Sequence, residues 1–187
     1  ITSPISSGRV TGILLEAFPD SSLPNMSLGR YPNGNFVLSD VDVVVSAPTL
    51  KTPVSAEIRQ AVSDYDQPGW PVSAIVEGKS TRTGKNPKGW AVDGPSKREN
   101  RKAMFLFAAP IPIPSEATIT ISLKHDAIGG HNIGRFRLST TDWATDTVKL
   151  DGSTIPDSLR KAIATPQAER TSAQRTEIAS YFRDTAD

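Results

Sequence analysis

The sequence contains no cysteine among its 187 residues. That absence excludes disulfides, thiolate metal ligands, a cysteine nucleophile and thioether attachment of haem within this chain. Histidine is nearly as scarce, with two residues, so a histidine-rich metal site is not expected. No run approaches the ~20 apolar residues of a membrane-spanning helix. We therefore expect no haem in this chain and no membrane span.

An excess of charge of one sign is also missing. Lysine and arginine total 21, aspartate and glutamate 20, and the formal net charge is +1. Nucleic-acid binding needs a basic excess or a basic face, so no nucleic-acid partner is expected. The one basic cluster, residues 97–102, is short and contains Glu99. We interpret it as a solvated loop, with an anion or polysaccharide contact as the alternative.

The usual signatures of catalysis do not occur. There is no Gly-x-Ser-x-Gly elbow, phosphate-binding glycine loop or dinucleotide fingerprint. His125 ends a predicted strand and His131 follows a turn, positions that favour a loop hydrogen bond over acid–base work. Two carboxylate pairs have the i, i+2 spacing that is common on strands and turns: Asp40/Asp42 and Asp64/Asp66. We predict that the chain is not an enzyme, and a small hydrolase is a distant alternative.

The elements that the sequence does predict are mostly strands. Prolines (15) and glycines (13) are scattered along the chain, which favours short strands and many turns. Apolar or alternating runs predict strands over 9–18, 35–45, 54–62, 71–76, 103–108, 117–124 and 134–141. Pro110, Pro112 and Pro114 are expected to end the ladder of the 103–108 strand. The fold class predicted for residues 1–150 is an antiparallel β-sandwich of jelly-roll type.

The pattern changes after residue 150. Residues 156–163 predict a short helix, and Thr171 with Gln174 forms a capping box that opens a second helix. Ile178, Tyr181 and Phe182 make a narrow apolar stripe on that second helix. Residues 151–187 are therefore predicted to be a helical extension or a linker to a downstream domain.

Asp40 and Asp42 occupy the most apolar of the predicted strands. Alternate residues of a strand share a face, so the two carboxylates lie on the same side, opposite Val41 and Val43. If that side is buried, the carboxylates need a cation or hydrogen-bond donors. If that side is exposed, the carboxylates mark the solvent-exposed face of a sheet. The two alternatives are a metal-supported binding domain and an ordinary sandwich strand.

Several phrases together resemble a known module. They are Val10–Glu16, Pro19–Pro24, Gly34–Asp40, Gly89–Val92, Gly134–Ser139 and Ala168–Thr171. In this order the sequence is similar to the accessory module between the cytochrome c-like region and the C-terminal domains of large exported planctomycetal proteins. The resemblance implies export to the periplasm, cell surface or medium, and a non-haem role. The chain starts at Ile1 without methionine, and we interpret it as a piece of a longer protein.

A second, weaker resemblance is to discoidin-like, galactose-binding β-sandwiches, in circularly permuted order. Residues 74–78 followed by Trp90 are similar to the loop and tryptophan of that family, and residues 38–41 to its closing strand. Glu77 and Asp40 replace the usual Asp and Glu, and the spacing to Trp90 is longer. The family often holds structural calcium at such positions. The resemblance implies Ca²⁺ ligands at Asp40 and Glu77, with Thr83 and loop carbonyls added.

Sugar recognition uses aromatic rings with polar side chains beside them. The candidate ligand-binding residues are Trp70, Tyr31 with Arg30 and Asn33, Trp143, and the arginines Arg135 and Arg137. The alternative for each ring is that it covers an end of the core. The alternative for the arginines is cross-strand pairing with acids such as Asp40 or Asp42.

The function predicted from these observations is a non-catalytic, carbohydrate-binding-like module of a larger exported protein. A polysaccharide or other glycan is the expected ligand. The alternative is a structural or docking domain that packs against neighbouring domains of its parent and binds no glycan. In that case the stripe on the second helix is a candidate packing surface.

Overall fold

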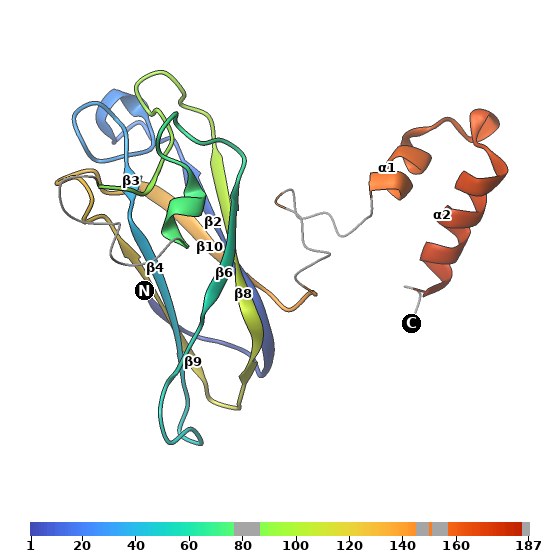
Figure 1. The fold of residues 1–187 in the computed structure, drawn as a ribbon, viewed down its shortest axis with the longest axis horizontal. Helices are drawn as coiled ribbons and strands as arrows, with labels where there is room; N and C mark the ends of the chain where they lie inside the picture. Colours follow the sequence, from blue (N-terminus) through green and yellow to red (C-terminus); the bar gives the residue numbers. More distant parts are fainter. Residues whose placement is uncertain (77–86, 145–149, 151–156, 185–187) are drawn as a thin grey trace. The chain divides into compact units, whose positions relative to one another are not determined.

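The computed structural model describes residues 1–76, 87–144, 150 and 157–184. The chain divides into two compact units, Ile1–Thr145 and Asp146–Asp187, which are considered separately. The first is built of strands and the second of helices (Figure 1). The candidate functional residues named above lie in the first unit, apart from the helical stripe.

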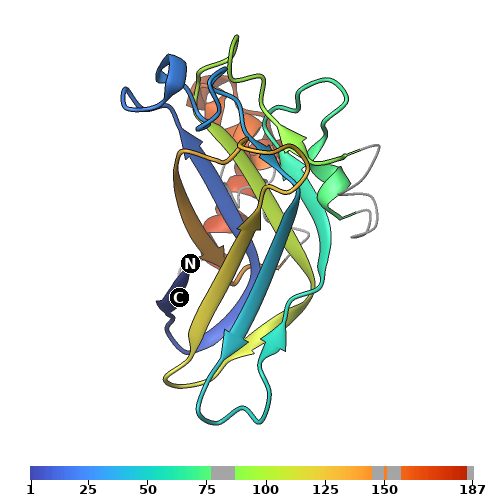
Figure 2. The ribbon, with the colours of Figure 1, turned by 90° about the vertical axis from the view of Figure 1, so that its left-hand side faces the viewer.

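Within the described residues, the first unit contains two four-stranded antiparallel sheets arranged as a sandwich (Figure 2). One sheet has the order β1 (Thr2–Pro4), β9 (Thr118–Lys124), β4 (Asp40–Ser46) and β5 (Val54–Ser55). The other has the order β10 (Arg135–Thr141), β2 (Gly8–Phe18), β8 (Arg101–Ile113) and β6 (Ile58–Ser63). A two-stranded ladder joins β3 (Val37–Leu38) to β7 (Trp90–Ala91). The prediction of a mainly β, sandwich-like chain with C-terminal helices is confirmed.

The core forms where the inward faces of the two sheets meet. Alternate residues are buried along β4 and β9, as the pleat requires, whereas the central strands β2 and β8 have runs of consecutive buried residues. The buried side chains include Val41, Val43, Val45, Ile119 and Ile121 from one sheet and Ile13, Leu15, Ala103, Phe105 and Phe107 from the other. Phe36 and Trp90 add an edge-to-face pair, with ring centroids 5.2 Å apart. Trp90 is thus a core residue, and its indole N–H donates to the Tyr65 carbonyl at 3.0 Å.

Two predicted strands are divided in the structure. The 35–45 run separates at Ser39 into β3, which pairs with β7, and β4, which pairs with β9. The Ser39 hydroxyl donates to the Lys124 carbonyl at 3.0 Å and accepts the Asp126 N–H at 2.9 Å, which satisfies backbone groups at the break. The 54–62 run likewise gives β5 in one sheet and β6 in the other.

The strand predicted over 71–76 is wrong. Residues Val72–Ile75 form a 3₁₀ turn, η2. The Asp66 carboxylate accepts the Val72 N–H at 3.0 Å, and the Pro71 carbonyl accepts the Ala74 N–H at 3.1 Å. Local acceptors therefore satisfy this backbone, and the apolar residues reach the core from a turn.

The expectation that prolines end the 103–108 strand is also wrong, because β8 continues to Ile113. Its pairing with β2 jumps from Val10↔Ile111 to Gly12↔Leu106, so Pro110 lies inside a bulge. Pro112 lies beyond Phe107, where the pairing of β8 with β6 has ended. A proline at a bulge or on an open strand edge removes no ladder hydrogen bond.

The second unit contains α1 (Asp157–Ala164), the turn η4 (Gln167–Glu169) and α2 (Ser172–Asp184). The capping box is confirmed: the Gln174 N–H donates to the Thr171 hydroxyl at 3.2 Å, and the Thr171 N–H donates to the Gln174 side chain at 2.9 Å. Leu159 and Ala162 of α1 are buried. None of the helices in the described ranges has the length and apolar character needed to traverse a bilayer.

One further short turn belongs to the first unit. Pro24–Met26 forms the turn η1, in which Asn25 and Met26 both have positive φ.

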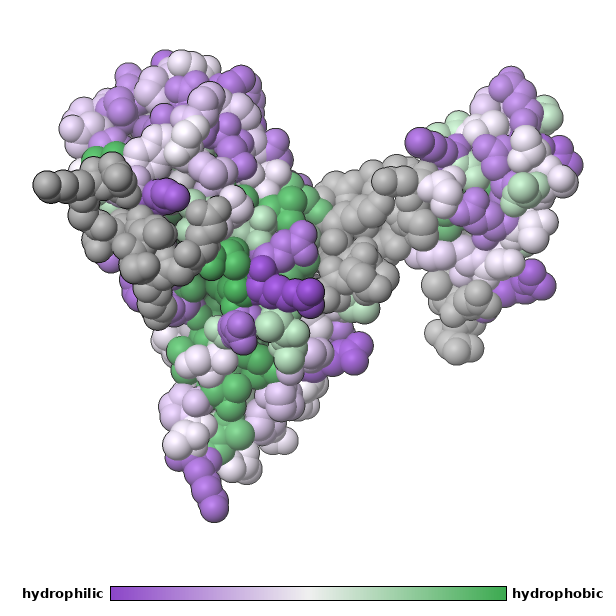
Figure 3. Space-filling view, viewed as in Figure 1, coloured by the Kyte–Doolittle hydropathy of each residue, from purple (hydrophilic) through white to green (hydrophobic). Residues whose placement is uncertain are grey.

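At the lateral edge between β4 and β6, hydrophobic surface follows the line where the two sheets part (Figure 3). The cleft along that line is lined by Val41 and Val43, which are buried, and by Ile58, which is partly exposed.

Candidate functional site

Loops gather at one end of the sandwich, where β2, β6 and β9 end and β8 and β10 begin (Figure 1). We call this end the loop rim; it comprises residues 19–36, 64–71, 92–100 and 125–134. Loops carried by a rigid sheet scaffold are frequent sites of recognition. The loop rim is therefore a candidate binding surface.

The loop rim is held together by a buried amide. Asn35 accepts the Gly94 N–H at 3.0 Å and the Val92 N–H at 3.4 Å, and it donates to the Gln67 side chain at 2.8 Å. The same Gln67 oxygen accepts the Asp93 N–H at 3.0 Å. One side chain thus connects three loops that are distant in sequence.

The backbone of the loop rim is packed so closely that Gly29 and Gly94 are positions where a side chain would not fit. A Cβ at Gly29 would lie 1.9 Å from the Asn35 carbonyl oxygen, and one at Gly94 would lie 2.3 Å from the Gly34 carbonyl oxygen. Such contacts fix the loops against one another before any ligand arrives. A surface on this rim loses little freedom on binding, which favours affinity.

Tyr31 is the exposed aromatic residue of the loop rim, with 38% of its surface accessible. Its ring stacks on His131, with centroids 3.8 Å apart and planes 18° from parallel. Arg30 lies beside it and donates from its backbone to the Asn132 carbonyl at 2.9 Å and from Nε to the Ile133 carbonyl at 3.3 Å. The structure therefore brings Tyr31 and Arg30 to a loop that is about a hundred residues away in sequence.

Asn33 is also exposed on this rim, where its side chain accepts the Asn35 N–H at 2.8 Å. Three predicted ligand residues, Arg30, Tyr31 and Asn33, thus belong to one surface. Sequence reasoning missed His131 as the support of the Tyr31 ring. The signal in the sequence was the Gly129–Gly130 turn, since a Cβ at Gly130, where φ is +77°, would lie 3.2 Å from the Tyr31 ring.

The two other predicted aromatic ligands differ from Tyr31 in exposure or in position. Trp70 is half-buried, and its backbone bonds to Gln67 and Ala91, so it closes a turn over the core. Trp143 is 48% exposed but follows β10 at the end of the sandwich away from the loop rim. Its carbonyl accepts the Thr11 hydroxyl at 2.6 Å. Of the predicted aromatic set, Trp70 is therefore a half-buried residue of the same rim, and Trp143 lies at the other end of the sandwich.

Arg137 pairs with an acid of the neighbouring strand β2, and Arg135 pairs with an acid in the loop that follows β2. Arg137 donates to Glu16 of β2 at 2.7 Å, and Arg135 lies 3.5 Å from Asp20. Both guanidinium groups lie over the Phe18 ring, at 5.6 and 5.8 Å. The hydrogen bond from Arg137 is the main reason why the pKa of Glu16 lies below its ordinary value. The pairing with acids expected for these arginines is present, but Asp40 and Asp42 were the wrong partners.

Asp40 and Asp42 lie on the other sheet and share a lysine. The Lys124 ammonium is 3.3 Å from Asp40 and also contacts Asp42. Asp40 is 5% exposed, so this ammonium supplies the positive charge that a buried carboxylate requires. The two hydrogen bonds, led by that to Asp42, raise the pKa of Lys124.

The structure gives no support for calcium at this position. An ammonium on the Asp40 carboxylate would repel a divalent cation, and the other predicted ligands, Glu77 and Thr83, lie outside the described residues. In the part of the chain that is described, no cluster of three or more His, Cys, Asp or Glu residues could hold a metal ion. A calcium site at Asp40, Glu77 and Thr83 stays a prediction.

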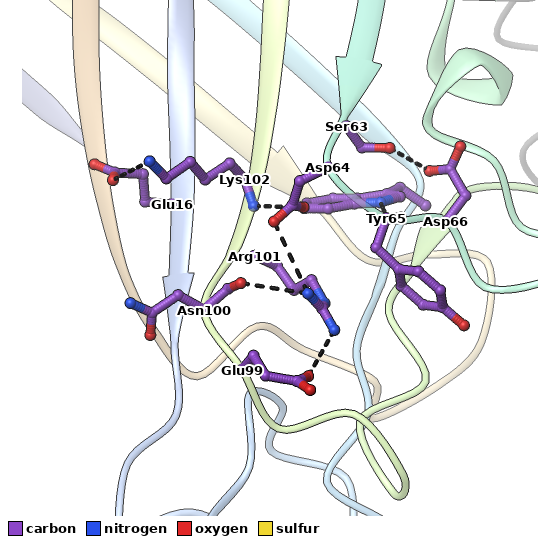
Figure 4. A network of polar contacts seen from close by, with 10 residues as sticks. Glu16, Ser63, Asp64, Tyr65, Asp66, Glu99, Asn100, Arg101 and Lys102 are labelled. Atoms are coloured by element: carbon purple, nitrogen blue, oxygen red, sulfur yellow. Dashed lines mark hydrogen bonds and ion pairs between the residues drawn. The ribbon is translucent and has the colours of Figure 1, made fainter. Parts of the chain in front are cut away.

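The basic cluster at 97–102 is not a free positive patch. Arg101 pairs with Glu99 at 2.7 Å and lies 3.9 Å from Asp64, and Lys102 approaches Glu16 at 3.9 Å (Figure 4). Arg101 and Lys97 each lie 4.9 Å from the Tyr65 ring. These contacts compensate much of the basic charge, which weighs against an anion site here.

Comparison with protein-family models, with curated proteins and with solved structures finds no match for this chain. The assignment of a function therefore depends on the residues of the loop rim and on the geometry around them.

Proposed function

We propose that the chain is a non-catalytic carbohydrate-binding module of a larger exported protein, with its ligand site on the loop rim around Tyr31. One observation carries the proposal: Tyr31 is fixed by stacking on His131 and yet remains accessible, with Arg30 beside it. The two-sheet architecture is consistent with a jelly-roll of the galactose-binding type. The resemblance to exported planctomycetal proteins supports the same setting.

The chemistry of such a surface suits a sugar. The face of a pyranose ring carries C–H groups that pack on an aromatic ring, and its hydroxyl groups need donors and acceptors around the edge. Arg30, Asn33 and Asn132, all exposed, provide those groups near Tyr31. Because His131 already holds the Tyr31 ring, binding does not have to order that side chain.

The test is binding of the purified 187-residue chain to a glycan array and to polysaccharide-containing gels. Tyr31→Ala is expected to weaken binding at least about tenfold, equivalent to about 1.4 kcal/mol. Trp143→Ala is the matched control, since it removes an exposed aromatic ring from the other end of the sandwich, and binding should be unchanged. No retention by any polysaccharide, or equal binding by wild type and Tyr31→Ala, rejects the proposal.

A second candidate function, a docking domain, is favoured by a groove on one side of the sandwich. The groove has a volume of about 530 Å³ and is lined by apolar residues of both sheets, among them Ile119, Ile121, Phe136 and Leu138. The groove lies between β1 and β10, each the outermost strand of its sheet in the described chain. Two open strand edges over an apolar floor suit one extended strand from a neighbouring domain, which would bond to β10 and place alternate side chains in the groove.

This candidate is tested by mixing the chain with separately produced flanking domains of its parent. Thr140→Lys places a charge at the groove and is expected to weaken association measured by calorimetry. Gln60→Lys, on the outermost strand β6 of the same sheet, is the control. Association that is unaffected by Thr140→Lys, or no association at all, removes the docking hypothesis.

A further inference from the structure

His125 makes a hydrogen bond that depends on its protonation state. The residue follows β9, and its ring nitrogen Nε2 accepts the backbone N–H of Ile133 at 3.2 Å. Only an unprotonated nitrogen can accept, so the proton of the neutral ring is on Nδ1. His125 and Ile133 are the two ends of the 125–133 loop, and this bond closes it.

The closed loop carries the support of the Tyr31 ring. His131 lies within it, and its carbonyl accepts the Val37 N–H at 2.9 Å. The Ile133 carbonyl accepts from Arg30 Nε at 3.3 Å, and Ile133 forms a bridge with Gly29. The residue that donates to His125 is therefore the same one that contacts Gly29 and Arg30, in the segment leading into Tyr31.

The surroundings of His125 favour its neutral form. Burial lowers the pKa of its ring, while the negative charge of Asp126 and a hydrogen bond to the Leu123 backbone act in the opposite direction. Two other cations on the neighbouring elements have partners of their own. Lys124 of β9 contacts Asp40 and Asp42, and Arg30 donates to the Ile133 carbonyl.

We infer that neutral His125 is a positioning residue for the Tyr31–His131 platform, and that protonation of His125 opens the 125–133 loop and weakens binding there. On protonation Nε2 becomes a donor that faces another donor, the Ile133 N–H, and the closing bond is lost. The part of this inference that concerns ligand binding rests on the function proposed for the Tyr31 surface. The part that concerns the loop does not.

The direction of the pH effect follows from linkage. A histidine whose pKa is lower in the folded state than the ordinary 6.5 binds fewer protons when folded than when unfolded. Its contribution to stability is complete above pH 6.5 and is lost as the pH falls through the folded-state pKa. One pH unit below that pKa, about a tenth of the molecules keep the acceptor.

The inference is tested by NMR on the isotopically labelled, full 187-residue chain between pH 8 and pH 4.5. The His125 ring nitrogens should report the Nδ1–H tautomer at high pH. Hydrogen-exchange protection of the Ile133 amide, corrected for the intrinsic rate, should fall about tenfold by one pH unit below the His125 pKa. The Tyr31 ring resonances should shift with the same midpoint.

His125→Gln separates this histidine from the other one. A glutamine offers an acceptor that does not titrate, so protection of the Ile133 amide should become independent of pH, whereas His131→Gln should leave the pH dependence in place. An Nε2–H tautomer in the wild type, unchanged Ile133 protection across the titration, or a pH dependence that persists in His125→Gln overturns the inference. If no glycan binds at any pH, the proposed function fails, and these NMR results still decide the role of His125.

Discussion

Replacement of Asn35 by alanine tests whether the loop rim is held by a single buried amide. The side chain is 6% exposed and joins three loops through its contacts with Gly94, Val92 and Gln67. Alanine removes both the acceptor and the donor of these hydrogen bonds. The loops should then separate from one another without loss of the sandwich below them.

The expected loss of unfolding free energy follows from the hydrogen bond that each partner of Asn35 loses. The Gly94 N–H at 3.0 Å is left without its acceptor in a buried position, which costs about 1–3 kcal/mol. The Val92 bond is longer, at 3.4 Å, and adds at most about 1 kcal/mol. Gln67 keeps the Asp93 N–H and loses little. The sum, about 1–4 kcal/mol, corresponds to a fall in Tm of about 2–16 °C.

Tryptophan fluorescence during urea unfolding is a suitable assay, because all three tryptophans lie within residues 1–145 and report on the sandwich unit alone. Asn100→Ala, at an exposed position on the same rim, is the control and should change the unfolding free energy by less than about 0.5 kcal/mol. If Asn35→Ala lowers the unfolding free energy by less than about 1 kcal/mol, and by no more than the control does, the assigned role of this side chain is refuted.

Two further predictions concern charged groups on the two sheets. Lys124→Met should destabilise the fold by about 1–3 kcal/mol, since it removes the ammonium shared by Asp40 and Asp42. EDTA should leave the Tm of the wild-type chain unchanged. A fall in Tm with EDTA, together with calcium in elemental analysis, would instead support the predicted metal. The pKa of Glu16 is lowered by Arg137, so Glu16→Gln should cost most stability above pH 4.5, and the difference from wild type should shrink as the pH falls through the lowered pKa. A difference that stays constant from pH 7 to pH 3 contradicts this reading of the pair.

Much of the β-architecture was predictable because strand pattern is local. The alternation in 117–124 and 134–141 predicts β9 and β10, and the capping box at Thr171 predicts the start of α2. The errors fall where a tertiary contact overrides the local pattern. Val72 lies in a turn because the Asp66 carboxylate accepts its N–H, and Pro112 is tolerated because no second strand pairs with that part of β8 in the described chain.

The candidate site was predictable only in part. Arg30, Tyr31 and Asn33 are neighbours in sequence, so a shared surface could be expected from their spacing alone. The same spacing could not show that His131 supports the Tyr31 ring, or that Trp143 lies at the other end of the sandwich. Nor could it assign Glu16 and Asp20, rather than the acids of β4, to the arginines of β10.

The sequence by itself determined which side chains face inward, because the two-residue period of the pleat acts between immediate neighbours. It also determined the absence of cysteine chemistry and the starts of the terminal helices. Only the tertiary structure decided which strands pair, which charged side chains form ion pairs and which residue supports the Tyr31 ring. Those choices depend on contacts between segments far apart in the chain, such as the bond from Arg30 to Ile133 across 103 residues, and no local pattern encodes them.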